Sequence, residues 1–249
     1  MNGMWLYQEI SPTRDDPEKH RVWVFSADYT NATIYHHPRE RKEISNYEWD
    51  SLAHLPTDQI WLAPLLADRN AVMIHSAGVI VNGQGLLFAG HSGAGKSTTV
   101  NMLKGVYLMN ALPGEDSNPG NGLKSGILCD DRNIIRHQDD GWFVHGTWSH
   151  GDVAEVSPAS APLRAIMFLQ QDTTNRLTPL TDRREIWKRL LATLIRPMVT
   201  EAWWQKELDV LEKIVEKVPC FTMQFNKSGA IVKELGDLVQ APPPGGTLT

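Results

Sequence analysis

The stretch at residues 90–97, GHSGAGKS, limits what this chain can fold into more than any other. It fits the pattern G-x-x-x-x-G-K-[ST], in which a glycine-rich loop turns its backbone N–H groups toward phosphate oxygens. We expect Lys96 to reach the β- and γ-phosphates of a nucleoside triphosphate, and the Ser97 hydroxyl to bind Mg²⁺. The residues expected to contact the nucleotide are Gly90, His91, Ser92, Gly93, Ala94, Gly95, Lys96, Ser97 and Thr98.

The residues on either side of this loop come in the order that such a motif requires. An apolar run at 85–89 predicts a buried strand before the loop. The run at 98–104 predicts a helix after it, with Gly105 as the glycine that caps its C-terminus. This order favours a genuine phosphate-binding loop over a chance glycine turn beside a surface lysine.

Composition narrows the class of protein and its partners. The chain has 249 residues and a formal net charge of -5, which argues against nucleic acid as a partner. Its two cysteines, Cys129 and Cys220, lack metal-ligand spacing, so we expect reduced core thiols in a cytoplasmic protein. No apolar run is long enough for a membrane helix, and the N-terminus lacks the basic head and apolar core of a signal peptide.

The chain is predicted to have three parts. We expect a small N-terminal α+β module at 1–70, a catalytic domain at 71–240 and a disordered tail at 241–249. The patterns in the first part predict strands at 4–7, 21–26 and 32–35 and a helix at 58–67, bent at Pro64.

The catalytic domain is predicted to be α/β, with a mixed, largely antiparallel sheet that carries the loop and is flanked by C-terminal helices. Asn82 and Gly83 predict a tight hairpin turn, residues 113–126 a long loop, and residues 226–229 a turn between strands. Helical periodicity marks residues 182–217. Strands are predicted at 71–75, 78–82, 126–129, 133–136, 142–145, 164–169 and 221–225.

Three polar features accompany the loop. Asp130 and Asp131 end an apolar strand, and adjacent carboxylates near phosphates are costly unless cations compensate their charge. One carboxylate suits Mg²⁺, and its neighbour can accept a proton from an attacking hydroxyl. His75 lies one hairpin upstream of the loop, and residues 146–152 gather hydroxyls, an imidazole and the carboxylate of Asp152 between glycines.

Taken in order, these features resemble a known family. His75, a hairpin, GHSGAGKS and a strand ending in Asp-Asp-Arg are similar to the catalytic domain of HPr kinase/phosphorylase, over residues 71–170. They are also similar to phosphoenolpyruvate carboxykinase, which shares that fold. The Glu-x-Arg-Gly signature tied to dephosphorylation in the HPr kinase family is missing here. Asp152 lies near the place of that signature's metal-binding glutamate and is the candidate to replace it.

The resemblance implies a mechanism and an assignment of roles. ATP and Mg²⁺ would bind at residues 90–98, with His75 and the two aspartates facing the γ-phosphate. Asp131 would activate the acceptor hydroxyl, whereas Asp130 would help to bind the metal. Together with Lys96, His75 and Asp131 are therefore the predicted catalytic residues, and Ser97, Asp130 and Asp152 the predicted metal ligands.

We expect an ATP-dependent kinase that transfers the γ-phosphoryl group to a hydroxyl of a protein, a peptide or a small molecule. Two alternatives stay open: carboxykinase-like transfer to a small carboxylic acid, and a nucleotide-dependent ATPase or switch. A G-protein would need Asn-Lys-x-Asp, which is absent, and Asn226-Lys227-Ser228-Gly229 is only a partial echo of it. The sequence predicts no nucleic-acid or membrane partner and leaves a homo-oligomer open.

Overall fold

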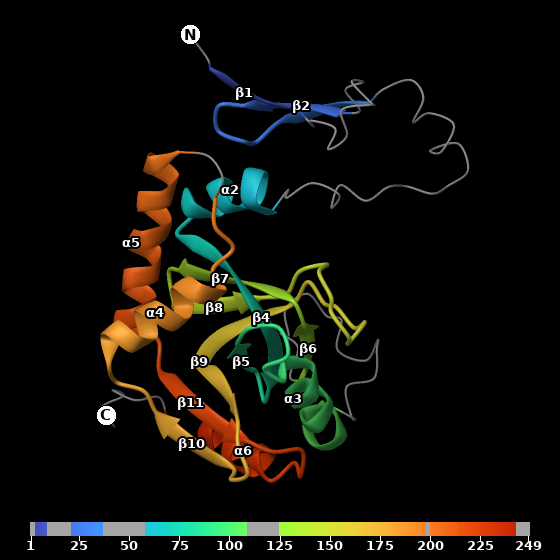
Figure 1. Ribbon diagram of the computed structural model, residues 1–249, viewed down its shortest axis with the longest axis vertical. Helices are drawn as coiled ribbons and strands as arrows, with labels where there is room; N and C mark the ends of the chain where they lie inside the picture. The colour runs from blue at the N-terminus through green and yellow to red at the C-terminus, as the bar shows by residue number, and fades with distance from the viewer. Residues whose placement is uncertain (1–2, 9–20, 37–57, 109–124, 198–199, 243–249) are drawn as a thin grey trace, which may run out of the picture.

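The structure is a computed structural model, and it describes residues 3–8, 21–36, 58–108, 125–197 and 200–242. The predicted loop at 113–126 and the predicted tail at 241–249 lie mostly outside these ranges. The described residues form an eight-stranded sheet with helices on both faces, and a separate three-stranded sheet near the N-terminus (Figure 1).

The large sheet has the strand order β10-β11-β9-β5-β4-β7-β8, with β6 paired to β4 and β8 paired also to β9. Its strands are β4 Ala71–Val81, β5 Gln84–Ala89, β6 Gly126–Cys129, β7 Arg132–Gln138, β8 Gly141–His145, β9 Ser160–Gln171, β10 Arg176–Pro179 and β11 Cys220–Phe225. Strand β9 runs parallel to β5 and β11, and the other neighbours are antiparallel. The predicted mixed, largely antiparallel sheet is therefore confirmed.

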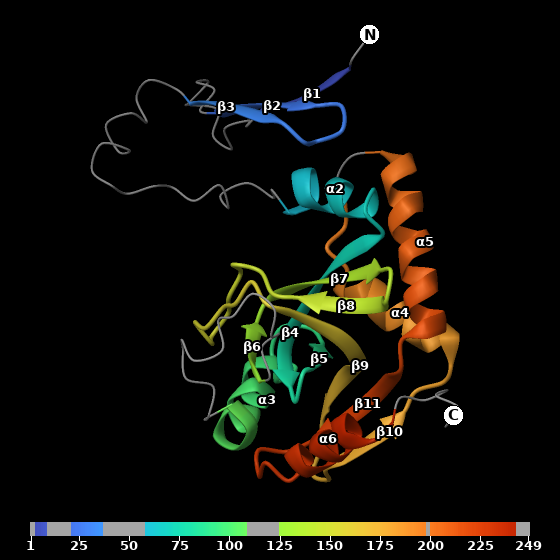
Figure 2. The same ribbon diagram turned by 180° about the vertical axis from the view of Figure 1, so that it is seen from behind.

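Five α-helices lie in the described residues: α2 Ala63–Ala67, α3 Lys96–Leu103, α4 Arg183–Thr193, α5 Glu201–Lys217 and α6 Ile231–Gln240. Side chains that alternate along β5 separate two cores, since Leu86 and Phe88 pack with α3 and α6, whereas Leu87 and Ala89 pack with α4 and α5. Burial on both faces explains why β5 reads as an unbroken apolar run. In Figures 1 and 2, α4 and α5 lie on one side of the sheet and α3 on the other.

Several local predictions are confirmed. Asn82 and Gly83 form the predicted turn with φ of 49° and 76°, the left-handed values that a two-residue hairpin of this kind requires. The strands predicted at 133–136 and 142–145 are observed as β7 and β8, which form a hairpin that turns at Asp139 and Asp140. Cys129 and Cys220 carry free, buried thiols. Within the described residues, no helix is long and apolar enough to cross a lipid bilayer.

Other local predictions need correction. Gly105 does not cap α3, because the chain continues past it as the π-helical segment Lys104–Leu108. The two strands predicted at 71–75 and 78–82 are one strand, β4, because the chain passes through Ser76 without leaving the sheet. Residues 226–229 connect β11 to a helix, α6, rather than to another strand. By contrast, the helix predicted at 58–67 is present: a π-helical segment, Asp58–Leu62, continues directly into α2, and the helix type changes next to Pro64.

The N-terminal sheet consists of β1 Met4–Gln8, β2 Arg21–Ser26 and β3 Ala32–His36, all antiparallel. Its inner face packs Phe25 and Tyr29 against Ala67 of α2 and Trp203 of α5. The ring centroids of Tyr29 and Trp203 are 5.2 Å apart, and Trp5 lies at the same distance from Trp203. An aromatic cluster therefore joins this sheet to α5, and the division of the chain between residues 70 and 71 stays a prediction.

Helix α5 also buries a carboxyl group. Glu207 is 0% exposed, and neither of its carboxyl oxygens has a hydrogen-bond partner among the described residues. It lies one turn from Trp203 and one turn from Leu211, on the face of the helix that packs inward. Burial raises the pKa of Glu207 from its ordinary value of 4.5 to about 8.

This burial predicts how stability depends on pH. Between about pH 4.5 and 8 the unfolded chain loses the Glu207 proton while the folded chain keeps it, so the free energy of unfolding falls as pH rises. Glu207→Gln removes the ionisation, and we expect it to be more stable than the wild type by about 3 kcal/mol at pH 7. Urea unfolding at pH 5 and pH 7 measures the difference.

The matched control is Glu212→Gln on the solvent-facing side of the same helix, which should follow the wild-type curve. If Glu207→Gln and the wild type lose stability in parallel across this range, Glu207 is not held as a buried neutral acid.

Candidate functional site

Sheet pairing brings the predicted site residues to one edge. Strands β5, β9 and β11 are parallel, so their C-terminal ends lie together at that edge. Strand β4 is antiparallel to β5, and because Ser76 pairs with Ala89, His75 lies beside the start of the loop. Strand β6 is antiparallel to β4, so the aspartates that follow Cys129 reach the same edge.

A bulge in the sheet presents the two aspartates. Strand β4 pairs with β6 up to Gly78 and Cys129, and with β7 from His75 and Arg132. Asp130 and Asp131 lie between these two pairings, and the Ser76 N–H donates to the Asp131 carbonyl over 2.9 Å.

Asn133 holds this bulge in place. Its fully buried amide nitrogen donates to the Ser76 carbonyl over 2.8 Å. The side chain crosses directly over Gly78, where a Cβ atom would come within 2.3 Å of the Asn133 amide oxygen. A side chain at position 78 would therefore displace the amide that fixes the path of the aspartates.

The glycine-rich loop at 90–97 adopts backbone angles that its glycines allow. Gly93 and Gly95 have φ of 79° and 104°, in the left-handed region where other residues are strained. Gly95 also lies against Phe225 of β11, and a Cβ atom there would come within 2.6 Å of the ring. The side-chain amide of Gln171, the last residue of β9, donates to the Gly93 carbonyl over 2.8 Å.

Lys96, the first residue of α3, folds back across the loop. It is 8% exposed, and its ammonium group donates to the carbonyls of Gly90 and His91 over 3.1 and 3.2 Å. Burial lowers the pKa of Lys96, and the negative charges of Asp131 and Asp130 oppose this shift. The lysine is thus desolvated and held by two weak neutral acceptors, which a more strongly charged partner can replace.

Asp131 receives contacts on both carboxylate oxygens. Its Oδ1 lies 3.4 Å from Nε2 of His75, and its Oδ2 accepts a hydrogen bond of 2.5 Å from the Ser149 hydroxyl. The Nε of Arg132 lies 3.3 Å from Oδ2. Burial, followed by the charge of Lys96, lowers the pKa of His75, so the imidazole is neutral at pH 7.

Asp130 points the other way and fixes the segment that follows β8. It is 2% exposed, and its two oxygens each accept a backbone N–H over 3.0 Å, from Gly151 and from Val153. A Cβ atom at position 151 would come within 2.4 Å of Asp130 Oδ1, so glycine is required for this contact. Each carboxylate oxygen of Asp130 has a second lone pair that these hydrogen bonds do not use. The role of Asp130 as a metal ligand stays a prediction.

These groups surround one polar cleft of about 450 Å³. Its lining includes His75, Lys96, Ser97, Asp130, Asp131 and Asp152, so the predicted catalytic residues and the predicted metal ligands share it. From the predicted nucleotide contacts, the cleft takes Ser92, Gly93, Gly95, Lys96, Ser97 and Thr98. Three do not line it: Ala94 is buried, and Gly90 and His91 direct their carbonyls at Lys96.

Gln171 and Lys227 line the cleft, although the sequence analysis did not predict them as site residues. Gln171 is the last residue of β9, and Lys227 comes two residues after the end of β11. Both reach the cleft because β5, β9 and β11 are parallel. The sequence marked residues 226–229 only as a turn, and the parallel pairing that gives Lys227 a place in the cleft has no local signal.

The cleft offers a small set of oxygen donors to a metal ion. Within the described part of the chain, no three His, Cys, Asp or Glu side chains gather closely enough to hold a metal by themselves. Ser97 and the exposed Asp152 nevertheless share the cleft with Asp130 and Asp131. A few oxygen ligands are enough for Mg²⁺, because this ion keeps several water molecules in its coordination shell and usually also binds substrate phosphates.

Comparisons with known proteins find a distant likeness to solved structures. No family model and no curated protein matches this sequence. Among solved structures, the chain is similar to the Hpr(Ser) kinase/phosphatase from Coxiella burnetii, with 9% identity and a TM-score of 0.35. The likeness covers 68% of this chain and 88% of that chain. That protein bears the name of the family that the motifs resemble. A likeness with this identity and TM-score supports no functional conclusion, so the proposed function rests on the geometry of the cleft.

Proposed function

We propose that this protein is an ATP-dependent kinase that transfers the γ-phosphoryl group to a hydroxyl of a protein, a peptide or a small molecule. One observation carries the proposal: Lys96, Ser97 and Asp131 line a single cleft, and Asp131 already accepts a hydrogen bond from a hydroxyl. A cation for the phosphates and a base for the acceptor are the two side chains that such a transfer needs most.

Each residue then has a chemical role. Lys96 leaves the carbonyls of Gly90 and His91 for the phosphates, while the N–H groups at the start of α3 face the same anion. Asp131 accepts the proton of the attacking hydroxyl, and neutral His75 orients that carboxylate from the opposite oxygen. Mg²⁺ held by Ser97, with Asp152 and Asp130 nearby, would neutralise charge on the transferred group.

A labelling experiment tests this proposal against its alternatives. The protein is incubated with Mg²⁺ and ATP labelled in the γ-phosphate, alone and with a cell extract. Label in a peptide or a hydroxyl-bearing metabolite supports the kinase. Free phosphate as the sole labelled product favours an ATPase or switch. Formation of ATP and oxaloacetate from ADP, phosphoenolpyruvate and carbon dioxide, and not in the absence of carbon dioxide, favours carboxykinase chemistry.

Lys227 provides a prediction about nucleotide affinity. It is an exposed cation on the cleft wall, and we expect it to contact a phosphate. Lys227→Ala should weaken nucleotide binding roughly tenfold, the value of one exposed charged hydrogen bond. Calorimetric titration with a non-hydrolysable ATP analogue measures this.

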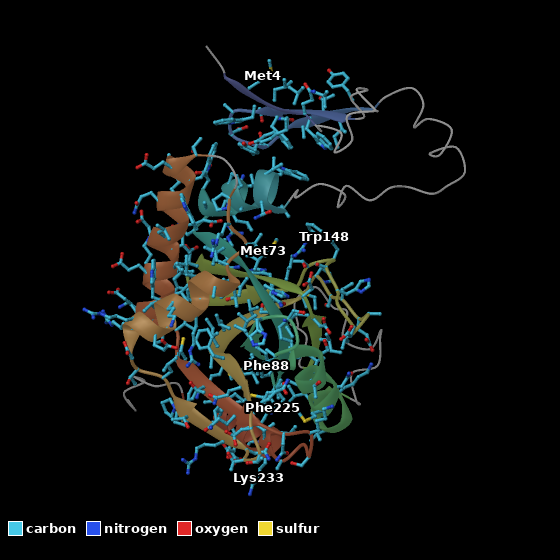
Figure 3. The ribbon with its side chains drawn as sticks, viewed as in Figure 1. Met4, Met73, Phe88, Trp148, Phe225 and Lys233 are labelled. Atoms are coloured by element: carbon cyan, nitrogen blue, oxygen red, sulfur yellow. The ribbon has the colours of Figure 1, made fainter. Side chains whose placement is uncertain are left out.

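Lys233 is the matched control, because it is an exposed lysine on α6 that does not line the cleft. Figure 3 shows it at the lower end of the molecule. Equal affinities for Lys227→Ala and Lys233→Ala would mean that Lys227 makes no contact with the nucleotide.

A further inference from the structure

The Ser149 hydroxyl lies against the carboxylate that we propose as the base for an acceptor hydroxyl. It donates to Asp131 Oδ2 over 2.5 Å, and this carboxylate lines the cleft with Lys96 and Ser97. A hydroxyl bound so closely to a carboxylate has the arrangement of a nucleophile beside its base. The short distance also indicates a charge-assisted hydrogen bond, in which the proton is already directed at the oxygen that would take it.

The segment around Ser149 is fixed on both sides. Before it, the Thr147 hydroxyl donates to the Arg132 carbonyl over 2.6 Å and accepts the Ser149 N–H over 3.1 Å. After it, Asp130 accepts the N–H groups of Gly151 and Val153. The two aspartates of the bulge thus hold the same segment, one through its backbone and the other through the hydroxyl of Ser149.

Ser149 contacts the cleft residue Asp131 without lining the cleft itself, and the hydroxyls that do line the cleft are arranged differently. Ser92 lines the cleft from the glycine-rich loop, and Ser97 and Thr98 line it from the first turn of α3; within the described residues none of them donates to a carboxylate. Trp148, beside Ser149, is 61% exposed, and Figure 3 shows it on the outer side of its segment. Ser149 therefore lies in a segment at the surface, while its side chain points inward and contacts Asp131, the predicted base.

We propose that Ser149 is an internal phosphate acceptor, which the protein modifies from its own bound nucleotide. This inference rests on the proposed function. A bond forms between the Ser149 oxygen and the γ-phosphorus, and the bond from that phosphorus to the bridging oxygen of ADP breaks. ADP leaves with the electron pair, and the Ser149 proton passes to the Asp131 carboxylate.

Modification of Ser149 would change the site itself. A phosphoserine carries roughly two negative charges, and here it would lie beside Asp131 and within the segment that Asp130 anchors. Like-charge repulsion would push the Ser149 side chain away from the base. The carboxylate of Asp131 would then be left open to an external hydroxyl.

The test uses the full-length protein after phosphatase treatment. It is incubated with ATP and Mg²⁺, and intact mass and peptide mapping follow the addition of one phosphoryl group. We expect phosphate on Ser149 in the wild type and on residue 149 in Ser149→Thr, with none in Ser149→Ala. Ser160→Ala, an exposed serine at the start of β9, is the matched control and should be modified like the wild type.

Two further measurements separate the possible failures. The half-time of modification should not change with protein concentration, because the acceptor belongs to the same molecule as the nucleotide. Binding of a fluorescent ATP analogue is measured on each variant in parallel. If ATP binds and Ser149 stays unmodified, or if Ser149→Ala gains as much phosphate as the wild type, the internal acceptor is wrong and the kinase proposal survives. If no nucleotide binds, both fail together.

Discussion

Lys96→Ala is expected to abolish phosphoryl transfer, with a loss of about a thousandfold or more in kcat/KM. The ammonium group is desolvated in the cleft, where a charge interacts with phosphates more strongly than it does in water. Alanine also removes the only side-chain contact that reaches the carbonyls of Gly90 and His91 within the described residues. Nucleotide affinity should therefore fall together with the rate, which single-turnover kinetics and calorimetry can measure separately.

The matched control is Lys104→Ala, which removes a lysine that follows the same helix and forms an ion pair with Glu155. This exposed pair contributes little to stability, so the variant should keep wild-type rate and affinity. Transfer by Lys96→Ala at a rate near that of Lys104→Ala would remove Lys96 from the catalytic residues.

Asp131→Asn should lower the rate of transfer by about a hundredfold to ten-thousandfold while leaving nucleotide binding intact. The amide keeps the shape of the carboxylate, and its oxygen can still accept the Ser149 hydroxyl, but it cannot take a proton. The expected signature is a fall in kcat with little change in the dissociation constant for ATP. Quench-flow measurement of single turnovers, with a binding titration beside it, checks both values.

Asp130→Asn is the informative comparison, because the neighbouring acid should respond in the opposite way. An amide nitrogen at this position would face a backbone N–H of Gly151 or Val153 and leave a buried donor without a partner. We expect a loss of stability of about 1 to 3 kcal/mol, seen in urea unfolding. If Asp131→Asn keeps its rate and loses stability instead, the roles of the two aspartates are exchanged.

Local patterns predicted much of this fold and of this site. The strand, loop and helix around residues 90–97, the hairpin at Asp139 and Asp140, and the strand before Asp130 all have signals within a few residues. The periodic residues Ile231, Leu235 and Val239 also mark α6, although that helix was not predicted. What local patterns could not supply is the parallel pairing of β9 with β5 and β11, since it joins segments far apart in sequence.

The division of labour between the aspartates had no local signal either. Adjacent carboxylates in a sequence look interchangeable, and both were predicted to face the phosphate. In the structure, the bulge between β6 and β7 turns Asp130 toward the N–H groups at 151 and 153, and Asp131 toward His75 and Ser149. Only the path of the segment after β8, which is set by contacts across the sheet, distinguishes them.

The aromatic contacts around Trp203 have a practical consequence for anyone who trims this chain. A fragment beginning at β4 would keep the cleft, yet it would strip Trp5, Phe25 and Tyr29 from the indole and leave it facing solvent. Bare aromatic surface of this kind promotes aggregation. Poor recovery of such a fragment would then reflect the loss of the residues that cover α5. It would say nothing about whether the part of the chain that forms the cleft can fold.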